Sequence, residues 1–306
     1  MSSSRCPICG SADLRLRFAS RAGSAPARVG AAGVGSSRAA VQPIRLRACR
    51  ACGAAWQDPP PPAAEVTAAY RDLRDELYLA EEATRRRSLR RALALLERRS
   101  GTRRGRLLDV GCSAGLFAEL ARASGWDVLG IEPSQWLAAR AEERLGGNVL
   151  CARFEEAALD PGSFDVVCLW DVLEHVLDPQ AFLAKAAAVL RPGGLLALNV
   201  PNIQSWIARA LGRRWPLLLP EHLFFFSPAS LRLLLARHDL ADAELHLHPV
   251  SFGAGYVAHR LAQHGIPGSR LLAGALAGGP LRHLRLPLLM GELTALARKV
   301  ERGERG

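Results

Sequence analysis

The stretch that most constrains how this 306-residue chain can fold is residues 106–134. It starts with an apolar run that ends at Val110, continues through the small-residue turn 111–115 and a helical apolar pattern, and closes with a second apolar run that ends at Glu132. A strand, a glycine turn, a helix and a strand in this order form one βαβ unit. Because glycines allow close backbone approach and a helix start presents unpaired N–H groups, the unit predicts a nucleoside site. The carboxylate of Glu132 is placed to accept both hydroxyls of a ribose.

The turn has the sequence Asp109-Val110-Gly111-Cys112-Ser113-Ala114-Gly115. It resembles the first motif of the class I S-adenosylmethionine (SAM)-dependent methyltransferases, in which an acid precedes three spaced glycines. Ser113 stands where that family usually has its middle glycine. The resemblance covers about residues 70–299. It implies an α/β fold with a doubly wound, seven-stranded, mostly parallel sheet, a Rossmann-like arrangement, and SAM as the cofactor.

The resemblance also implies a set of cofactor-binding residues at the carboxyl ends of the strands. They are Asp109, Gly111, Cys112, Gly115, Glu132, Glu155, Trp170 and Asp171. The turn would hold the methionine half, Glu132 the ribose and Glu155 the adenine amino group. Trp170 and Asp171 would lie beside the sulfonium, since a cation is attracted to π faces and carboxylates. Packing in the core is the alternative for Trp170, and a surface position the alternative for Glu155.

The same turn fits a second pattern, the Gly-x-Ser-x-Gly nucleophile elbow of α/β-hydrolases. Ser113 would then be the nucleophile, with Asp171 or Asp178 and then His222 downstream. This interpretation gives Glu132 no role, and it lacks the strands that normally precede an elbow. A dinucleotide fold is less compatible still, because it requires Gly-x-Gly-x-x-Gly to seat a pyrophosphate.

Two C-x-x-C-G knuckles precede this region and predict a structural zinc site. Each knuckle places two thiolates on one metal, and two knuckles complete a closed tetrahedral shell. The expected ligands are Cys6, Cys9, Cys49 and Cys52. Alternating runs at 14–18 and 44–47 predict the strands of a zinc ribbon, and the Ala/Gly/Ser-rich segment 20–43 predicts a flexible loop between them.

These patterns divide the chain into a zinc ribbon at 1–57, a linker and helical region at 58–104, a methyltransferase domain at 105–299 and a tail at 300–306. Alternating strands and helices predict a parallel sheet covered on both faces.

Within the domain, a helix is expected to open at Asp171, a strand is expected over 195–200, and an antiparallel closing strand over 292–298. Residues 251–291 are then an insertion between the last two strands.

Methyl transfer requires in-line geometry and a base for the acceptor proton. His175 follows Trp170 and Asp171 by about one turn, and His222 lies in the segment 220–227 next to Glu221. The Glu-His pair followed by aromatics is similar to a segment of some sugar methyltransferases and quinone-pathway O-methyltransferases. We rank His222 above His175 as the base, with Glu221 either orienting the imidazole or sharing the proton transfer. A helix-packing role for His175 and a buried hydrogen-bonding role for His222 stay open.

The acceptor is expected to be a small molecule or a glycan, with methylation on oxygen. The zinc ribbon is similar to that of sugar C-methyltransferases, but the chain stops where those enzymes continue into a further domain. The net charge of +11 keeps an RNA methyltransferase as an alternative, although the arginines are dispersed and RNA is the less favoured substrate. A protein that binds SAM without turnover is a third possibility. The oligomeric state is not indicated.

The segment 203–219 is amphipathic and basic, with Trp206 and Trp215. It predicts either a lid over the acceptor pocket or a peripheral contact with an anionic membrane. The chain starts without an apolar signal region and has no uncharged apolar run of about 18 residues. The expected location is therefore the cytoplasm, either free or at the inner face of the membrane.

Overall fold

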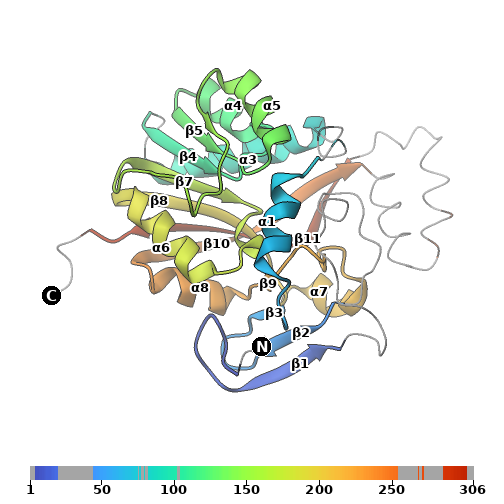
Figure 1. Ribbon diagram of the computed structural model, residues 1–306. Coiled ribbons are helices and arrows are strands. Elements are labelled where there is room, and N and C mark those ends of the chain that lie inside the picture. The colour runs from blue at the N-terminus through green and yellow to red at the C-terminus, as the bar shows by residue number, and fades with distance from the viewer. Residues whose placement is uncertain are drawn as a thin grey trace.

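The structure, a computed structural model, describes residues 4–19, 44–74, 82–101, 104–253 and 285–301, together with residues 76, 79, 268 and 271. These residues form a layered α/β unit with a small sheet packed below it (Figure 1). The elements of the α/β unit are α1 (Ala63–Arg71), α3 (Glu82–Ser100), β4 (Arg106–Val110), α4 (Leu116–Ala123), β5 (Asp127–Ile131), α5 (Gln135–Leu145), β6 (Val149–Leu150), β7 (Phe164–Trp170), η1 (Leu173–His175), α6 (Pro179–Val189), β8 (Leu190–Pro201), α7 (Trp206–Leu211), η2 (Gly212–Arg214), α8 (Pro228–Ala236), β10 (Leu240–Gly253) and β11 (Arg285–Lys299).

Within the described residues, the larger sheet has the strand order β10-β11-β8-β7-β4-β5-β6. Strands β4 to β8 are parallel to one another, and β11 lies antiparallel between β8 and β10. Glu292 pairs with Pro201 and Arg298 with Leu195. This register confirms the antiparallel closing strand, and the order confirms the seven-stranded, mostly parallel sheet.

Helices cover both faces of this sheet. In β4, Leu107 packs with residues of α3 and α4, whereas Leu108 and Val110 pack with residues of α6 and α8, because successive strand side chains point to opposite faces. Figure 1 shows α3, α4 and α5 above the sheet and α6 and α8 below it. With both faces buried, a strand such as β7 is a nearly continuous apolar run.

The small sheet contains a strand from the α/β unit. Its order is β1-β2-β3-β9, formed by β1 (Leu14–Phe18), β2 (Leu46–Cys49), β3 (Ala55–Gln57) and β9 (Phe224–Phe225). The pairing of β3 with β9 is antiparallel, with Ala55 opposite Phe225 and Trp56 opposite Phe224. The ribbon and the α/β unit therefore share backbone hydrogen bonds.

The structure shifts several expected element boundaries. The second ribbon strand begins at Leu46 and not at residue 44, and β8 begins at Leu190 and not at residue 195. β10 continues to Gly253 and β11 starts at Arg285, so the insertion shrinks from 251–291 to 254–284. The ends of these two strands pair with each other. This pairing gives the extra residues backbone hydrogen-bond partners, which explains why the strands are longer than the sequence pattern indicates. Apart from residues 268 and 271, the shortened insertion lies outside the described residues, as does the expected loop 20–43.

The helix expected to open at Asp171 is only the single 3-10 turn η1. Asp171 has a φ of +55°, which is outside the right-handed helical region. Residue 178 precedes a proline, and that position disfavours helical backbone. Its side chain instead caps α6, with Oδ1 accepting from Gln180 N and Ala181 N. The chain therefore interrupts the helical pattern and restarts it at Pro179.

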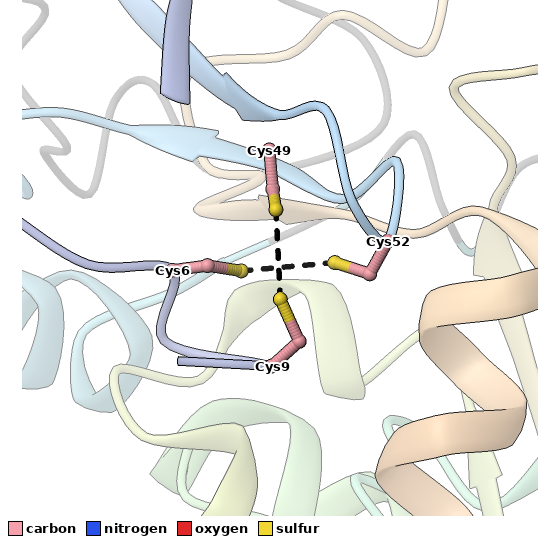
Figure 2. Close-up of side chains that lie close together, drawn as sticks. All are labelled: Cys6, Cys9, Cys49 and Cys52. Carbon is pink, nitrogen blue, oxygen red and sulfur yellow. Dashed lines mark hydrogen bonds between the residues drawn. The ribbon is translucent and has the colours of Figure 1, made fainter. Parts of the chain in front are cut away.

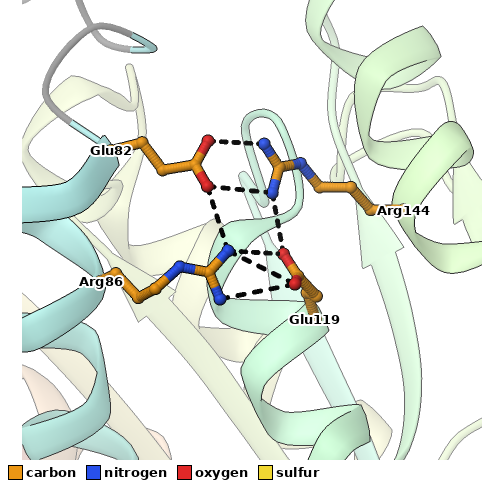
Figure 3. Close-up of polar contacts among 4 residues, drawn as sticks. All are labelled: Glu82, Arg86, Glu119 and Arg144. Carbon is orange, nitrogen blue, oxygen red and sulfur yellow. Dashed lines mark hydrogen bonds and ion pairs between the residues drawn. The ribbon is translucent and has the colours of Figure 1, made fainter.

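An ion-pair network joins the start of α3 to α4 and α5 (Figure 3). Arg144 of α5 donates to both Glu82 at 2.6 Å and Glu119 of α4 at 2.8 Å. Arg86 of α3 donates to the same two carboxylates at 3.0 and 3.1 Å. The four side chains are 26–35% exposed. Such a network stabilises a protein more than an isolated surface pair does, and this one ties α3 to α4 and α5.

We expect Glu119→Gln to lower the free energy of unfolding by about 1 kcal/mol in low salt, because two arginines lose a shared partner. Urea denaturation measures this change, with Glu143→Gln on the exposed face of α5 as the control. The hydrogen bonds from Arg144 lower the pKa of Glu82. The network's contribution is therefore present above the ordinary glutamate pKa of about 4.3 and is lost as the pH falls through the lowered native value. Equal stability of the Glu119→Gln and wild-type proteins at neutral pH would contradict the prediction.

Candidate active site

The turn between β4 and α4 has the backbone geometry of a ligand cradle. Gly111, Ser113 and Gly115 have φ values of +70°, +52° and +78°. A Cβ on Gly111 would lie 2.8 Å from the side chain of Val172, so only glycine fits there. Ser113 takes the left-handed conformation that glycine adopts without strain, which explains why its position favours glycine in the resembling family.

Glu132 ties this turn to the end of β5. Its carboxylate is 5% exposed; Oε2 accepts from Ser113 N at 2.9 Å and Oε1 from Ser134 N at 2.9 Å. Burial raises the pKa of Glu132 to about 7, and the two main-chain hydrogen bonds oppose that shift. A carboxylate has further lone pairs on both oxygens, so the same group can accept from two adjacent hydroxyls.

Asp109 lies near the end of β4, one residue before Val110, and is buried. Burial, together with the nearby charge of Glu132, raises the pKa of Asp109 to about 8, and a main-chain hydrogen bond from Ala118 opposes this shift. Its Oδ2 has no hydrogen-bond partner among the described residues. A buried polar atom is normally satisfied, so this oxygen and the carboxylate of Glu132 fit a ligand with both an amino group and hydroxyls, as SAM has.

The other implied cofactor residues occupy different surroundings. Cys112 directs its sulfur toward Gly130, and its N–H is bonded to the carbonyl of Ile131, so it shapes the turn. Glu155 is exposed and ion-paired with Arg153 at 2.7 Å. Both residues lie at the expected edge of the sheet.

Trp170 and Asp171 leave the end of β7 in different directions. The Trp170 ring meets Phe117 of α4 edge-on at 5.2 Å and packs partly into the core below α3 and α4. Asp171 is exposed, and its Oδ1 accepts from Asn199 Nδ2 at 2.5 Å. Asp171 therefore lies between the cofactor turn and the end of β8.

Helix α1 and the residues after it cover the cofactor turn. Ala69 and Leu73 pack against Ala114 and Leu137, and Ser134 Oγ donates to the carbonyl of Leu73 at 2.8 Å. In Figure 1, α1 crosses in front of the strand ends. The helical region before the domain is thus one wall of the site.

Tyr70 of α1 connects this wall to the histidines. Its hydroxyl lies 2.6 Å from His175 Nδ1, and the same nitrogen lies 3.0 Å from the carbonyl oxygen of Glu221. Burial lowers the pKa of His175 to about 4, although the Glu221 carbonyl favours the protonated ring. Burial, together with the charges of Glu221, Glu174 and Glu132, raises the pKa of Tyr70. Sequence reasoning placed Tyr70 only in an apolar stripe; a tyrosine among leucines and alanines was the available signal.

His222 faces His175 and has a defined tautomer. The two ring centroids are 4.7 Å apart and edge-on. His222 Nδ1 lies 2.9 Å from the carbonyl oxygen of Leu217. Because a carbonyl can only accept, the proton is on Nδ1 and the lone pair on Nε2. Burial and the neighbouring His175 hold the pKa of His222 well below its ordinary value, so the ring is uncharged at neutral pH.

Buried carboxylates that sequence reasoning did not select complete the surroundings. Glu174 is 1% exposed, and its Oε2 has no hydrogen-bond partner among the described residues. Burial, followed by the charge of Asp171, raises the pKa of Glu174. The same two causes raise the pKa of Glu292 on β11 to about 8. Glu174, His175 and His222 also bring one ligand atom each within 4.8 Å of one another, a spacing that can hold a divalent cation. Only the tertiary structure brings Glu292 near enough to Glu174 to raise its pKa.

The four knuckle cysteines converge on one point (Figure 2). Sγ of Cys6 lies 3.7 Å from that of Cys52, and Sγ of Cys9 lies 3.5 Å from that of Cys49. All four sulfurs lie within 4.8 Å of one another. Zinc–sulfur bonds of about 2.3 Å in a tetrahedron place sulfurs about 3.8 Å apart, so the donor set fits Zn²⁺. The cluster matches the expected ligands.

The segment 203–219 is packed between the ribbon and the α/β unit. Trp215 is fully buried with Ile203, Leu46 and Phe225, and its Nε1 donates to the carbonyl of Met290 at 2.8 Å. Trp206 at the start of α7 is 68% exposed. None of the helices in the described part of the chain has the length and apolarity needed to cross a membrane.

Comparison with known proteins places this geometry in a family. The methyltransferase domain family matches residues 81–245. The ubiquinone biosynthesis O-methyltransferase of Bradyrhizobium sp. (strain ORS 278) is 39% identical over 112 residues, which cover 35% of this chain and 43% of the relative. That of Aromatoleum aromaticum is 31% identical over 163 residues, 49% of this chain and 70% of the relative. The match thus spans less than half of the Bradyrhizobium protein.

Solved structures show the same fold. A SAM-dependent methyltransferase from Archaeoglobus fulgidus superposes with a TM-score of 0.51 and 20% identity, covering 74% of this chain and 100% of that chain. One from Thermotoga maritima gives 0.50 and 18%, covering 73% and 94%. Because the methyltransferase domain family matches residues 81–245, the α/β-hydrolase alternative is wrong. Ser113 lies in the left-handed turn. The chain belongs to the methyltransferase domain family of class I SAM-dependent methyltransferases.

Proposed function

We propose that this protein transfers a methyl group from SAM to a hydroxyl of a small, quinone-like aromatic molecule. The observation that carries the proposal is the neutral ring of His222, whose Nε2 has a lone pair that can take a proton. This ring lies beside the carboxyl edge of the sheet, where the cofactor turn also lies. The relatives named for ubiquinone biosynthesis support an O-methyltransferase. A glycan hydroxyl is the second acceptor class, and RNA a third that steep salt dependence of binding would reveal.

The residues of this chain would divide the work as follows. SAM, when bound, would supply a methyl group on a positively charged sulfur; the acceptor oxygen would bond to the methyl carbon as the carbon–sulfur bond breaks, with S-adenosylhomocysteine as the leaving group. Glu132 would hold the ribose hydroxyls and the glycine turn, with Asp109, the methionine end. Nε2 of His222 would accept the hydroxyl proton as the oxygen attacks. Tyr70 and His175 would hold the acceptor against His222, and α1 would keep water out.

We propose that Cys6, Cys9, Cys49 and Cys52 hold a structural Zn²⁺. The sulfur spacing supports the metal, and four cysteine ligands leave no open position for catalysis.

Contact of the segment 203–219 with an anionic membrane is also a proposal. The exposed Trp206 with Arg209 and Arg213 supports it, since aromatic and basic residues together favour the interface.

Glu132→Gln should weaken binding of S-adenosylhomocysteine about 10- to 100-fold, because hydrogen bonds to a charged group are each worth about 1.5–3 kcal/mol. The raised pKa of Glu132, about 7, means that the ionised form increases between about pH 6 and 8. The affinity of the wild type should therefore rise over this range and that of Glu132→Gln should stay flat, measured by titration calorimetry. Glu155→Gln is the comparison variant, which shows the effect of removing a different carboxylate. An equal pH dependence of affinity in the wild type and in Glu132→Gln would contradict the role of Glu132.

His222→Ala should lower kcat by about 100-fold or more with a catechol acceptor, since positioned general bases contribute about 10²–10⁴-fold. Binding of S-adenosylhomocysteine should stay within about twofold of wild type. His238→Ala is the control, because that histidine is bonded to Gln180 of α6 and lies outside the segment 220–227. Normal turnover by His222→Ala with the cofactor bound would remove His222 as the base.

The purified protein should contain one zinc ion per chain by metal analysis, and Cys49→Ser should lose it. The free energy of unfolding should fall by several kcal/mol, because metal binding is coupled to folding. Cys151→Ser, at the exposed cysteine, should keep both zinc and stability. A full zinc content in Cys49→Ser would contradict the ligand set.

A further inference from the structure

One ribbon residue, Gln57 at the end of β3, is bonded directly to the segment that carries the proposed base. Its side-chain Nε2 donates to the carbonyl oxygens of Pro220 at 2.6 Å and His222 at 2.9 Å. Its main-chain N–H donates to the carbonyl of Leu223 at 2.9 Å. Gln57 therefore fixes three carbonyl groups within four consecutive residues.

The peptide unit after His222 is held at both ends. Its carbonyl accepts from Gln57, while the N–H of Leu223 donates to the carbonyl of Glu174 in η1 at 2.7 Å. The His222 ring is then held separately by Leu217. With the backbone and Nδ1 both fixed, the direction of Nε2 follows from where Gln57 places the backbone.

A glutamine is costly at this position unless its amide is used. Gln57 is 6% exposed, and its two neighbours in β3, Ala55 and Trp56, are buried and apolar. Burying an amide without hydrogen bonds destabilises a protein, whereas an apolar residue of similar size would only add packing. The amide matters because two main-chain carbonyls near His222 require a donor.

We propose that Gln57 is a positioning residue for methyl transfer, through which the ribbon sets the orientation of His222. This inference rests on the proposed function of His222 as the acceptor base. Gln57 acts through the backbone of residues 220–223 and does not itself contact the acceptor. The ribbon then contributes a positioning residue to the acceptor site.

The chain offers a matched control at the opposite side of the ribbon. Nε2 of Gln180 on α6 also donates to two main-chain carbonyls across the boundary between ribbon and α/β unit, those of Pro7 at 3.0 Å and Ile8 at 3.1 Å. These carbonyls belong to the first knuckle and not to the segment 220–227. Gln180→Met removes the same kind of contact without touching His222.

The experiment compares Gln57→Met and Gln180→Met in the 306-residue chain loaded with zinc. Gln57→Met should lower kcat with a catechol acceptor about 10- to 100-fold, since a misplacement of about 1 Å costs up to about 100-fold. Zinc content and S-adenosylhomocysteine affinity should stay within about twofold of wild type. Nitrogen-15 NMR of the His222 ring should show loss of the single Nδ1–H tautomer. Gln180→Met should keep wild-type kcat and the wild-type ring signals.

The proposal is overturned if Gln57→Met keeps both kcat and the His222 ring signals, or if Gln180→Met changes them equally. Loss of cofactor affinity together with kcat would also overturn it, because a general loss of structure then explains the effect. If Gln57→Met does not fold, Gln57→Asn keeps an amide that is one carbon too short to reach both carbonyls, and the same criteria apply. If the wild type binds S-adenosylhomocysteine but methylates no acceptor, the proposed function fails, and the ring signals alone decide the role of Gln57.

Discussion

The buried carboxylate of Glu132 is the interaction on which the cofactor half of the structure depends. It accepts the N–H of Ser113 in the glycine turn and that of Ser134 at the start of α5. Without it, a left-handed turn that contains a serine would lose its main tertiary restraint. Ser134 in turn bonds to Leu73, which brings the wall formed by α1 over the same point. One acid therefore organises the turn, the next helix and the cover.

The acceptor half is organised by neutral groups in a poorly solvated space. Burial keeps both histidines unprotonated and keeps the nearby carboxyl groups of Glu174 and Glu292 in their protonated form up to higher pH. A fixed charge would be destabilised in this space, so main-chain carbonyls and not ion pairs orient the two histidine rings.

The ribbon is bonded directly to the segment that carries His222 and is more than an appendage. Its sheet continues into β9, Ser227 Oγ donates to the carbonyl of Cys52 at 2.6 Å, and Gln57 holds the carbonyls near His222. The proposed zinc ion would therefore stabilise the ribbon at Cys52, five residues before Gln57, which is bonded to the segment of the proposed acceptor base. In linear sequence the knuckles are more than 160 residues from His222, so this connection exists only in three dimensions.

The sequence alone predicted the βαβ unit, the alternation of strands and helices in the larger sheet, and the four cysteines that converge in the structure, because each depends on local periodicity or on motif spacing. The catalytic role of Glu221 and His222 stays a prediction. The sequence did not determine the single turn η1, the length of β10 and β11, the wall formed by Tyr70, or the carboxylates of Glu174 and Glu292. Those features depend on strand pairing and on burial between segments far apart in the chain. A hydrogen-bond donor such as Gln57 has no local signature at all, because its partners are main-chain carbonyls that any residue can supply and only the folded chain brings to it.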